Sequence, residues 1–380
     1  MTVLTRPKPF RAEHVGSLLR PRNVHEARVH HGASTVSSSG FNTNDDLLEI
    51  ENQAITTVVS MQEDVGLPVV TDGEYRRSFW HYDFMGALSG MELVERDTGV
   101  QFHGRALRPI HPTITGRLDF PDKHPMLDHF RYLASVTKVL PKISIPGPSA
   151  CHFRTAPADI APPQYADVEV LFADLERTYA KAVQAFYDVG CRYLQMDDIF
   201  FAYLCDPKIR EQKRAAGFDP DWLISKYANV MHNAIKDRPA DMLIGMHMCR
   251  GNFRSTWVAD GAYDPVVDAI FNQTDVDVYF MEYDSERAGG LEPLRLLPKG
   301  RKRVMPGFIT TKQGALETVD DLKRRFDEAA KYADIAQLGI APQCGFASTE
   351  EGNELSYDEQ RRKLELVVAT ADDLWGGVAA

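Results

Sequence analysis

Thiol, imidazole and carboxylate side chains follow apolar segments in the second half of the chain. His247 and Cys249 are two residues apart on a strand-like segment, so both side chains point to the same side. Glu282 follows the next apolar segment, and Cys344 follows the last one. Two thiolates, an imidazole and a carboxylate form a tetrahedral ligand set that suits Zn(II) better than a hard cation. The pattern therefore predicts a zinc site built from His247, Cys249, Glu282 and Cys344.

The other cysteines lack this arrangement. Cys151 is adjacent to His152, and adjacent side chains diverge on an extended chain. Cys191 and Cys205 flank a predicted strand and are typical of buried thiols. An isolated His-x-Cys pair is also more often core packing than a metal site. The zinc interpretation therefore depends on the two more distant ligands reaching the same place.

A zinc ion with two thiolates and a carboxylate is formally anionic. Such an ion activates water poorly, but it can hold a substrate thiol as a nucleophilic thiolate at neutral pH. The ligand set therefore predicts alkyl transfer to sulfur. The alternative is a non-catalytic, structural zinc, although structural zinc usually staples loops in small domains.

Elements of secondary structure must position these side chains, and the sequence alternates between strand-like and helical patterns. This alternation predicts an α/β fold in which a parallel sheet closes into a (β/α)8 TIM barrel. A doubly wound sheet is the alternative, although no glycine-rich phosphate loop follows any predicted strand. The first strand should end near Val15, and the others are expected at 67–71, 143–145, 193–196, 242–246, 276–281, 304–309 and 335–340.

Helical periodicity fills most of the intervals between these strands. We expect a single barrel domain over residues 1–380, with an insertion around 99–135 that is hairpin-like over 99–124. A Ser- and Gly-rich stretch at 32–43 is expected to be an excursion from the barrel. Asp45 or Asp46 should cap the first predicted helix. The predicted helices span 44–64, 167–187, 220–236, 265–272, a short stretch near 291, 315–332 and 357–374.

Catalytic groups of such barrels lie at the C-terminal ends of the strands, where this chain places further polar residues. Glu74 and Asp197 are acids at predicted strand ends, as recognition of an ammonium group requires. The alternative for each is a structural, salt-bridged carboxylate, with Arg76 or Arg77 at hand.

Charge and composition exclude several function classes. The chain has 43 Lys and Arg against 54 Asp and Glu, a net charge of -11, which disfavours a nucleic-acid partner. It contains no apolar run near the roughly 18 residues that span a bilayer, and its start lacks a secretory leader pattern. We expect a cytoplasmic protein with small-molecule partners, and homo-oligomerisation stays open.

Six stretches of polar and ligand residues follow one another along the chain: His14-Val-Gly-Ser17-Leu18, Asp72-Gly-Glu74 with Arg77, Gln195-Met-Asp197, His247-Met-Cys249, Glu282 and Gln343-Cys-Gly345. In this order they resemble the catalytic barrel of cobalamin-independent methionine synthases over nearly the whole chain. The resemblance implies that zinc binds the sulfur of homocysteine and directs it at the methyl group of a 5-methyltetrahydropteroylglutamate. It also implies that Ser17 holds the substrate carboxylate, that Glu74 and Asp197 hold its amino group, and that the four ligands above bind zinc.

The chain departs from this pattern in two ways. The full-length methionine synthases carry a second, N-terminal barrel, for which 380 residues leave no room, so the alkyl donor stays open. They also place a histidine after the seventh strand, near the position of Thr310 in this chain. Short single-barrel relatives include epoxyalkane:coenzyme M transferases, in which the zinc-bound thiol of coenzyme M opens an epoxide. Arg76, Arg77 or Lys312 could then meet the sulfonate.

Methyl transfer to homocysteine is the favoured function, because an α-amino thiol needs the two acids Glu74 and Asp197. A barrel decarboxylase of the porphyrinogen type is a further alternative, but it would need neither metal nor thiol. The aromatic run from Phe79 to Phe84 could stack on a flat donor such as a pterin, or it could form a lid or a subunit contact.

Overall fold

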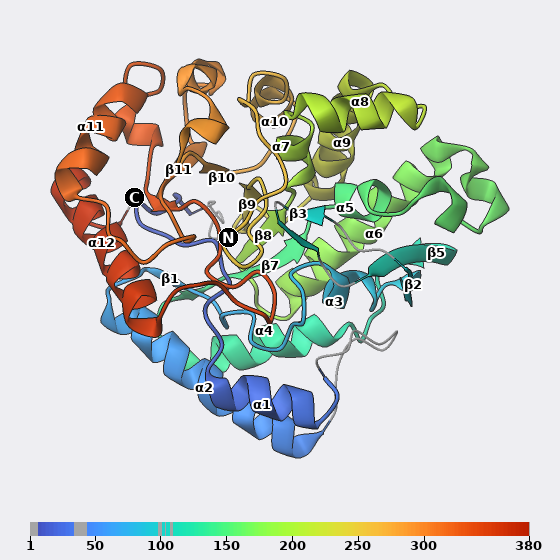
Figure 1. Cartoon of the computed structure of the whole chain (residues 1–380), viewed down its shortest axis with the longest axis horizontal. Helices are drawn as coiled ribbons and strands as arrows, with labels where there is room; N and C mark the ends of the chain where they lie inside the picture. The colour runs from blue at the N-terminus through green and yellow to red at the C-terminus, as the bar shows by residue number, and fades with distance from the viewer. Residues whose placement is uncertain (1–6, 34–43, 98–100, 103, 107–108, 380) are drawn as a thin grey trace, which may run out of the picture.

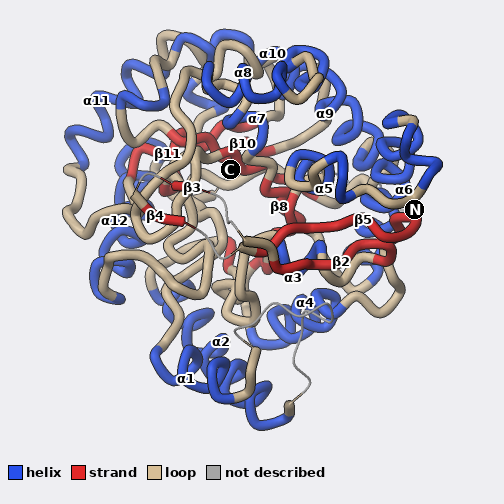
Figure 2. The backbone as a smooth tube through the Cα atoms, turned by 45° about the vertical axis from the view of Figure 1, so that its right-hand side comes forward, coloured by secondary structure: helices blue, strands red, loops and turns tan. Residues whose placement is uncertain are grey.

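The computed structural model describes residues 7–33, 44–97, 101–102, 104–106 and 109–379. Parallel strands form the centre of the molecule, and helices surround them (Figure 1). This arrangement confirms the predicted α/β barrel. Figure 2 shows the strands inside the ring of helices.

Six parallel strands form a continuous sheet in the order β12-β11-β10-β9-β8-β7. The register aligns their C-terminal ends, because Asp197 pairs with His247 and Glu282 pairs with Gly307. Side chains at these ends therefore share one rim of the barrel. The strands are β7 (Ile143–Pro146), β8 (Tyr193–Asp197), β9 (Leu243–Met248), β10 (Val278–Glu282), β11 (Arg303–Ile309) and β12 (Ala341–Pro342).

Two further segments close the sheet into a barrel. A parallel pair of short strands continues past β7, with Lys142 separating its second strand from β7. The extended segment after Phe10 closes the other side, because Ala12 bridges Ile340 and the Leu18 N–H donates to the Gly73 carbonyl at 3.0 Å. The short strands are β1 (Val69–Val70) and β6 (Leu140–Pro141).

The barrel interior is packed with apolar side chains from successive strands, so it is a core and not a channel. Both members of a buried ion pair, Lys142 and Glu13, also lie within this interior, with Nζ and Oε2 3.2 Å apart. The packed residues are Val15, Val69, Tyr193, Leu243, Val278, Phe280, Met305 and Ala341.

Helices with one apolar face cover the outside of the barrel and confirm most of the predicted periodicity. Three of them, α1, α4 and α8, had no counterpart among the predicted helices. The longer helices are α1 (Arg22–His30), α2 (Asp45–Asp64), α4 (Pro125–Val136), α6 (Val168–Asp188), α8 (Pro207–Ala215), α9 (Pro220–Ile235), α11 (Val319–Ala329) and α12 (Tyr357–Trp375); α10 (Val267–Asn272) is shorter.

Several predicted boundaries were wrong. The cap of α2 is Asn44, whose side chain accepts a hydrogen bond from the Leu47 N–H, and not Asp45 or Asp46. The short helix expected near residue 291 is present, as the 3-10 helix η4 (Glu292–Leu296). Helix α11 begins later than predicted, because Thr318 caps it.

The eighth predicted strand, 335–340, was also partly wrong. Its first residues form the 3-10 helix η5 (Ile335–Gln337), because the Asp334 side chain accepts a hydrogen bond from the Ala336 N–H. Strand pairing begins only at Leu338, which bridges Val304. The sequence pattern there is mostly apolar, and the prediction overlooked Asp334, an acid placed to cap such a turn, and the polar Gln337.

The segment after β1 departs from the barrel as an antiparallel hairpin. Its strands β2 (Ser89–Glu95) and β5 (Ile110–Asp119) pair with each other, with β3 (Gln101–Phe102) and β4 (Arg105–Ala106) at the tip. The hairpin thus begins ten residues before the predicted 99–124.

Residues 34–43, within the predicted excursion, and 98–100, 103 and 107–108 lie outside the described residues. The assignment of the chain to one domain stays a prediction.

No helix in the described part of the chain is both long enough and apolar enough to cross a bilayer.

Candidate metal centre

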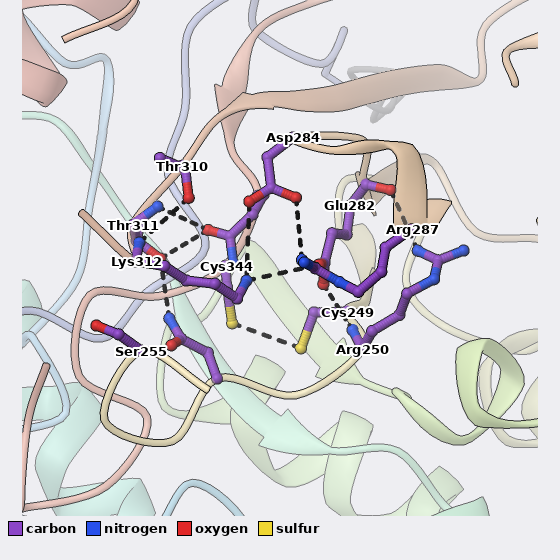
Figure 3. A network of polar contacts seen from close by, with 12 residues as sticks. Cys249, Arg250, Ser255, Glu282, Asp284, Arg287, Thr310, Thr311, Lys312 and Cys344 are labelled. Carbon is purple, nitrogen blue, oxygen red and sulfur yellow. Dashed lines mark hydrogen bonds and ion pairs between the residues drawn. The ribbon is translucent and has the colours of Figure 1, made fainter. Parts of the chain in front are cut away.

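Three of the four predicted zinc ligands meet at the C-terminal rim of the barrel. His247 lies in β9, Cys249 directly follows this strand, and Cys344 lies two residues beyond β12. Their ligand atoms lie within 4.8 Å of one another, and all three side chains are buried. The two sulfur atoms are 3.5 Å apart and point toward each other (Figure 3).

The neighbouring groups favour one thiolate in this pair of cysteines. The hydrogen bond between Cys344 and Cys249, together with the adjacent His247, lowers the pKa of Cys344 to about 5, against the effect of burial. The same contact with Cys344, together with burial, raises the pKa of Cys249. The thiol pair therefore loses its first proton readily and its second proton only at high pH. Binding of a divalent cation can displace this second proton.

His247 is held so that one ring nitrogen faces the sulfur atoms. Its Nδ1 lies 3.2 Å from Asp197 Oδ1, which also accepts a hydrogen bond from Gln195 Nε2 at 2.8 Å. Its Nε2 is buried and has no hydrogen-bond partner among the described residues. A metal-binding histidine normally uses its other nitrogen in this way to fix the ring. Two sulfurs and an unpartnered imidazole nitrogen fit a thiophilic divalent cation.

Glu282, the fourth predicted ligand, lies beside this triad but contacts other groups. Its Oε2 accepts a hydrogen bond from the Arg250 N–H at 2.7 Å, and its Oε1 lies 2.8 Å from Arg287 and 3.5 Å from Lys312 (Figure 3). Burial alone would raise the pKa of Glu282, but Lys312 and Arg250 outweigh it and lower the pKa to about 2. The carboxylate is thus ionised, and its role as a metal ligand stays a prediction.

A pocket opens beside the triad, and the three predicted substrate residues Ser17, Glu74 and Asp197 lie in its wall. Its free volume is about 30 Å³, room for about one water molecule, so a larger ligand requires the side chains around it to move. The aromatic part of the wall consists of Phe79, Trp80, Phe102, Tyr203 and Phe253.

Glu74 is fixed in an unusual backbone conformation. Its φ is 63°, in the left-handed region that costs a non-glycine residue energy. Ser144 Oγ donates to Glu74 Oε1 at 2.9 Å, and Arg77 lies 3.5 Å from Oε2. Burial raises the pKa of Glu74 to about 7, opposed by Arg77 and reinforced by Asp197. The two acids therefore face one small volume, as an ammonium site requires.

Arg77 lies behind Glu74 instead of in the pocket wall. Its guanidinium is fully buried and donates to the Ser144 carbonyl at 2.6 Å. Arg77 therefore positions Glu74 and the strand β7. Its predicted contact with substrate stays a prediction.

Ser17 joins the extended segment after Phe10 to the loop that carries Cys344. The Phe346 N–H donates to the Ser17 carbonyl at 2.8 Å, and the Ala347 N–H donates to its Oγ at 3.3 Å. A side chain at Gly345 would overlap Ser17 Oγ. This close approach explains why glycine follows Cys344.

The cations considered for a sulfonate already have partners. Arg76 lies 3.4 Å from Glu51 and over the ring of Tyr132, away from the triad. Arg77 is occupied as described above. Lys312 lies 3.5 Å from Glu282 and 3.8 Å from Asp284. These contacts make the three cations poorly placed to bind a sulfonate.

The aromatic run 79–84 divides between core and pocket. Phe79, Tyr82 and Phe84 are almost fully buried, so they are mainly packing. Phe79 and Trp80 reach the pocket wall. The sequence interpretation overlooked three other pocket residues, Arg154, Tyr203 and Asn252. They lie four to eight residues beyond the ends of β7, β8 and β9, on short helices and loops where no motif marks them.

Comparisons with known proteins agree with this fold. The family model described as "Cobalamin-independent synthase, Catalytic domain" matches residues 13–373. The uncharacterized protein YxjH of Bacillus subtilis (strain 168) is 45% identical over 97% of this chain and 96% of its own length.

One solved structure and one larger relative add to this comparison. The putative vitamin-B12 independent methionine synthase from Listeria monocytogenes has a TM-score of 0.75 and 36% sequence identity, covering 98% of this chain and 100% of that one. The protein of Bacillus velezensis named 5-methyltetrahydropteroyltriglutamate--homocysteine methyltransferase is 24% identical over 77% of this chain, but over only 35% of its own length.

Proposed function

This chain belongs to the catalytic-domain family of cobalamin-independent methionine synthases, and we propose that it is a zinc-dependent methyltransferase that converts homocysteine to methionine. The donor would be of the methyltetrahydrofolate type, as the name of the Bacillus velezensis relative says for that protein. The observation that carries the proposal is the buried triad His247, Cys249 and Cys344, with its unpartnered imidazole nitrogen.

In this proposal the triad holds zinc, and Glu282 is its fourth ligand. Bound zinc would keep the substrate thiol as a nucleophilic thiolate at neutral pH. Asp197 orients the imidazole of His247 from the opposite side. Lys312 and Arg287 offset the negative charge of Glu282, so this carboxylate remains ionised within the buried rim.

The substrate amino group would lie between Glu74 and Asp197, and Ser17 would bind its carboxylate. Both acids line the same pocket as the sulfur atoms, so a thiol on the metal and an ammonium on the acids belong to one small molecule. Opposite charges at hydrogen-bond distance give the strong, directional contacts that fix an amino acid. Homocysteine carries all three groups, whereas coenzyme M has no amino group.

We also propose a cytoplasmic location. All five cysteines are buried, free thiols, as expected in a reducing compartment. A homo-oligomer is compatible with the fold, but the proposal does not require one.

The test is zinc-edge X-ray absorption on the purified protein, before and after addition of homocysteine and, separately, coenzyme M. We expect zinc with two protein sulfurs and a third sulfur when homocysteine is added. A third sulfur only with coenzyme M would replace this proposal with epoxide opening. Absence of bound zinc from a metal-replete preparation would overturn it. Methionine formation from 5-methyltetrahydropteroyltriglutamate then tests the donor.

A further inference from the structure

A second cavity, of about 620 Å³, lies beside the pocket at the triad. It is formed by the short helix α5 (Ser149–Phe153), the segment 154–171 and the helix α8, which lie on the same side of the barrel (Figure 1). Its size is within the range of small-molecule sites, whereas the pocket at the triad is far smaller. The wall is largely apolar and includes Ile160, Pro162, Tyr165, Leu171 and Phe218.

Two cationic side chains face this cavity, and no acidic residue lines it. Arg154 and Lys213 are half-buried in its wall. Neither forms an ion pair with a carboxylate among the described residues; Lys213 lies over the ring of Phe153 at 3.6 Å, and Arg154 lies over Phe200 at 5.3 Å. Arg154 Nε is buried and has no hydrogen-bond partner within the described part of the chain.

The local electrostatics favour an anionic ligand in this cavity. Burial and the nearby Arg154 lower the pKa of Lys213 to about 8, so it still carries a proton at neutral pH. Burial and Lys213 lower the pKa of His152 to about 4, so this neighbour is neutral and adds no charge. Two uncompensated cations in one half-buried cavity would both be stabilised by an anionic ligand.

Arg154 connects the two cavities, because it lines the pocket at the triad as well. An alkyl donor must place its reactive carbon against the metal-bound sulfur. The pocket there cannot hold a donor of any size, so the remainder of the molecule must extend into adjoining space.

We propose that the cavity between α5 and α8 binds the anionic, carboxylate-bearing tail of the alkyl donor, with Arg154 and Lys213 as its cationic contacts. The inference rests on the proposed function and specifies its second substrate. The apolar wall would contact the uncharged part of the tail, and Arg154, at the junction, would contact the part nearest the reacting group.

The test compares 5-methyltetrahydropteroyltriglutamate with the monoglutamate form, by titration calorimetry on the zinc-loaded enzyme. We expect the triglutamate form to bind more tightly. Lys213→Gln should weaken its binding about tenfold and reduce the difference between the two forms. Zinc content and homocysteine binding should be unchanged, since Lys213 does not line the pocket at the triad.

The matched control is Lys208→Gln, on the same helix. Lys208 is exposed and lines only a neighbouring cavity, which Arg154 and Lys213 also border and which includes Asp206 and Asp260. We expect this change to leave triglutamate binding within twofold of the parent. An equal effect of the two lysine changes would reduce the finding to a general surface-charge effect and overturn the inference.

Two further results would also overturn it. The first is that inorganic phosphate binds in a Lys213-dependent way without displacing the triglutamate form. This result would mean that the cavity binds an anion other than the alkyl donor. The second is that neither pteroyl compound binds, while homocysteine still adds a sulfur to zinc. That second result would still support zinc-dependent binding of homocysteine. Failure of the donor-site inference can therefore be distinguished from failure of the proposed function.

Discussion

Asp197 Oδ1 lies 3.2 Å from His247 Nδ1, and both residues lie in paired strands at the same register position. Asp197 therefore has two proposed roles: it orients His247, and it lines the pocket proposed for the substrate ammonium. An aspartate that orients a metal-binding histidine contributes its acceptor oxygen, whereas recognition of an ammonium needs its charge.

Two substitutions of Asp197 separate these two roles. Asp197→Asn keeps an acceptor oxygen and loses the charge, so zinc should be retained while the Kd for homocysteine rises about tenfold. Asp197→Ala loses both and should lower zinc affinity by about 10- to 100-fold as well. Competition with a chromophoric chelator measures zinc affinity, and calorimetry measures homocysteine binding. Unchanged homocysteine binding in Asp197→Asn would disprove the amino-group assignment.

Removal of either thiol of the triad should remove the metal. Cys249→Ala and Cys344→Ala each take away one of three close donors, so we expect both variants to lose bound zinc and methyl transfer together. Elemental analysis after dialysis gives the zinc content. Cys205→Ala is the matched control, because Cys205 is equally buried but lies outside the triad, and it should keep its zinc. A zinc-bearing, active Cys344→Ala protein would contradict the assignment.

The role of Glu74 can be tested with two thiols that differ only in the amino group. Glu74→Gln should raise the Kd for homocysteine about tenfold, because the amide lacks the charge that pairs with an ammonium. Binding of 4-mercaptobutanoate, which lacks the amino group, should change less than twofold in the same variant. Calorimetry on the zinc-loaded proteins makes both measurements. Equal losses for the two thiols would mean that Glu74 shapes the pocket without recognising the amine.

The sequence predicted the barrel because strand-like and helical patterns alternate along the chain, and this periodicity can be recognised without knowledge of distances. It also predicted the triad, since parallel strands bring their C-terminal ends to one rim. The direction of the Glu282 carboxylate could not be predicted, because it depends on Arg287 and Lys312, which reach it from two separate loops. The cavity beside Arg154 was equally hidden, because it arises from packing between α5 and α8.

Glu282 should also stabilise the metal-free protein. It is fully buried between Lys312 and Arg287, so Glu282→Gln would remove the nearest counter-charge of both cations and leave them Asp284, at 3.8 Å and 3.5 Å. We expect the free energy of unfolding to fall by about 2 kcal/mol. Urea unfolding in the presence of a chelator gives this value, with the exposed neighbour Glu286→Gln as control. A loss of stability no greater than that of the control would show that other groups compensate these cations.

Acid should destabilise the fold partly through His124, which is buried beside Phe84 and caps α4 through its side chain. Burial lowers its pKa from 6.5 to about 4, so the unfolded chain takes up this proton at a higher pH than the folded protein. The stability contributed by the neutral ring is therefore complete above pH 6.5 and is lost as the pH falls toward 4.

His124→Asn keeps a side chain that can cap α4 but removes the titrating ring. From pH 7 to pH 5 the parent should lose about 2 kcal/mol of unfolding free energy relative to this variant. Glu74, whose pKa is raised, contributes to the pH dependence of stability in the opposite direction. This contribution is equal in the parent and the variant, so it cancels when their unfolding free energies are compared. Urea unfolding at pH 7, 6 and 5 supplies the free energies. Parallel pH dependence in the two proteins would show that His124 titrates normally in the folded state.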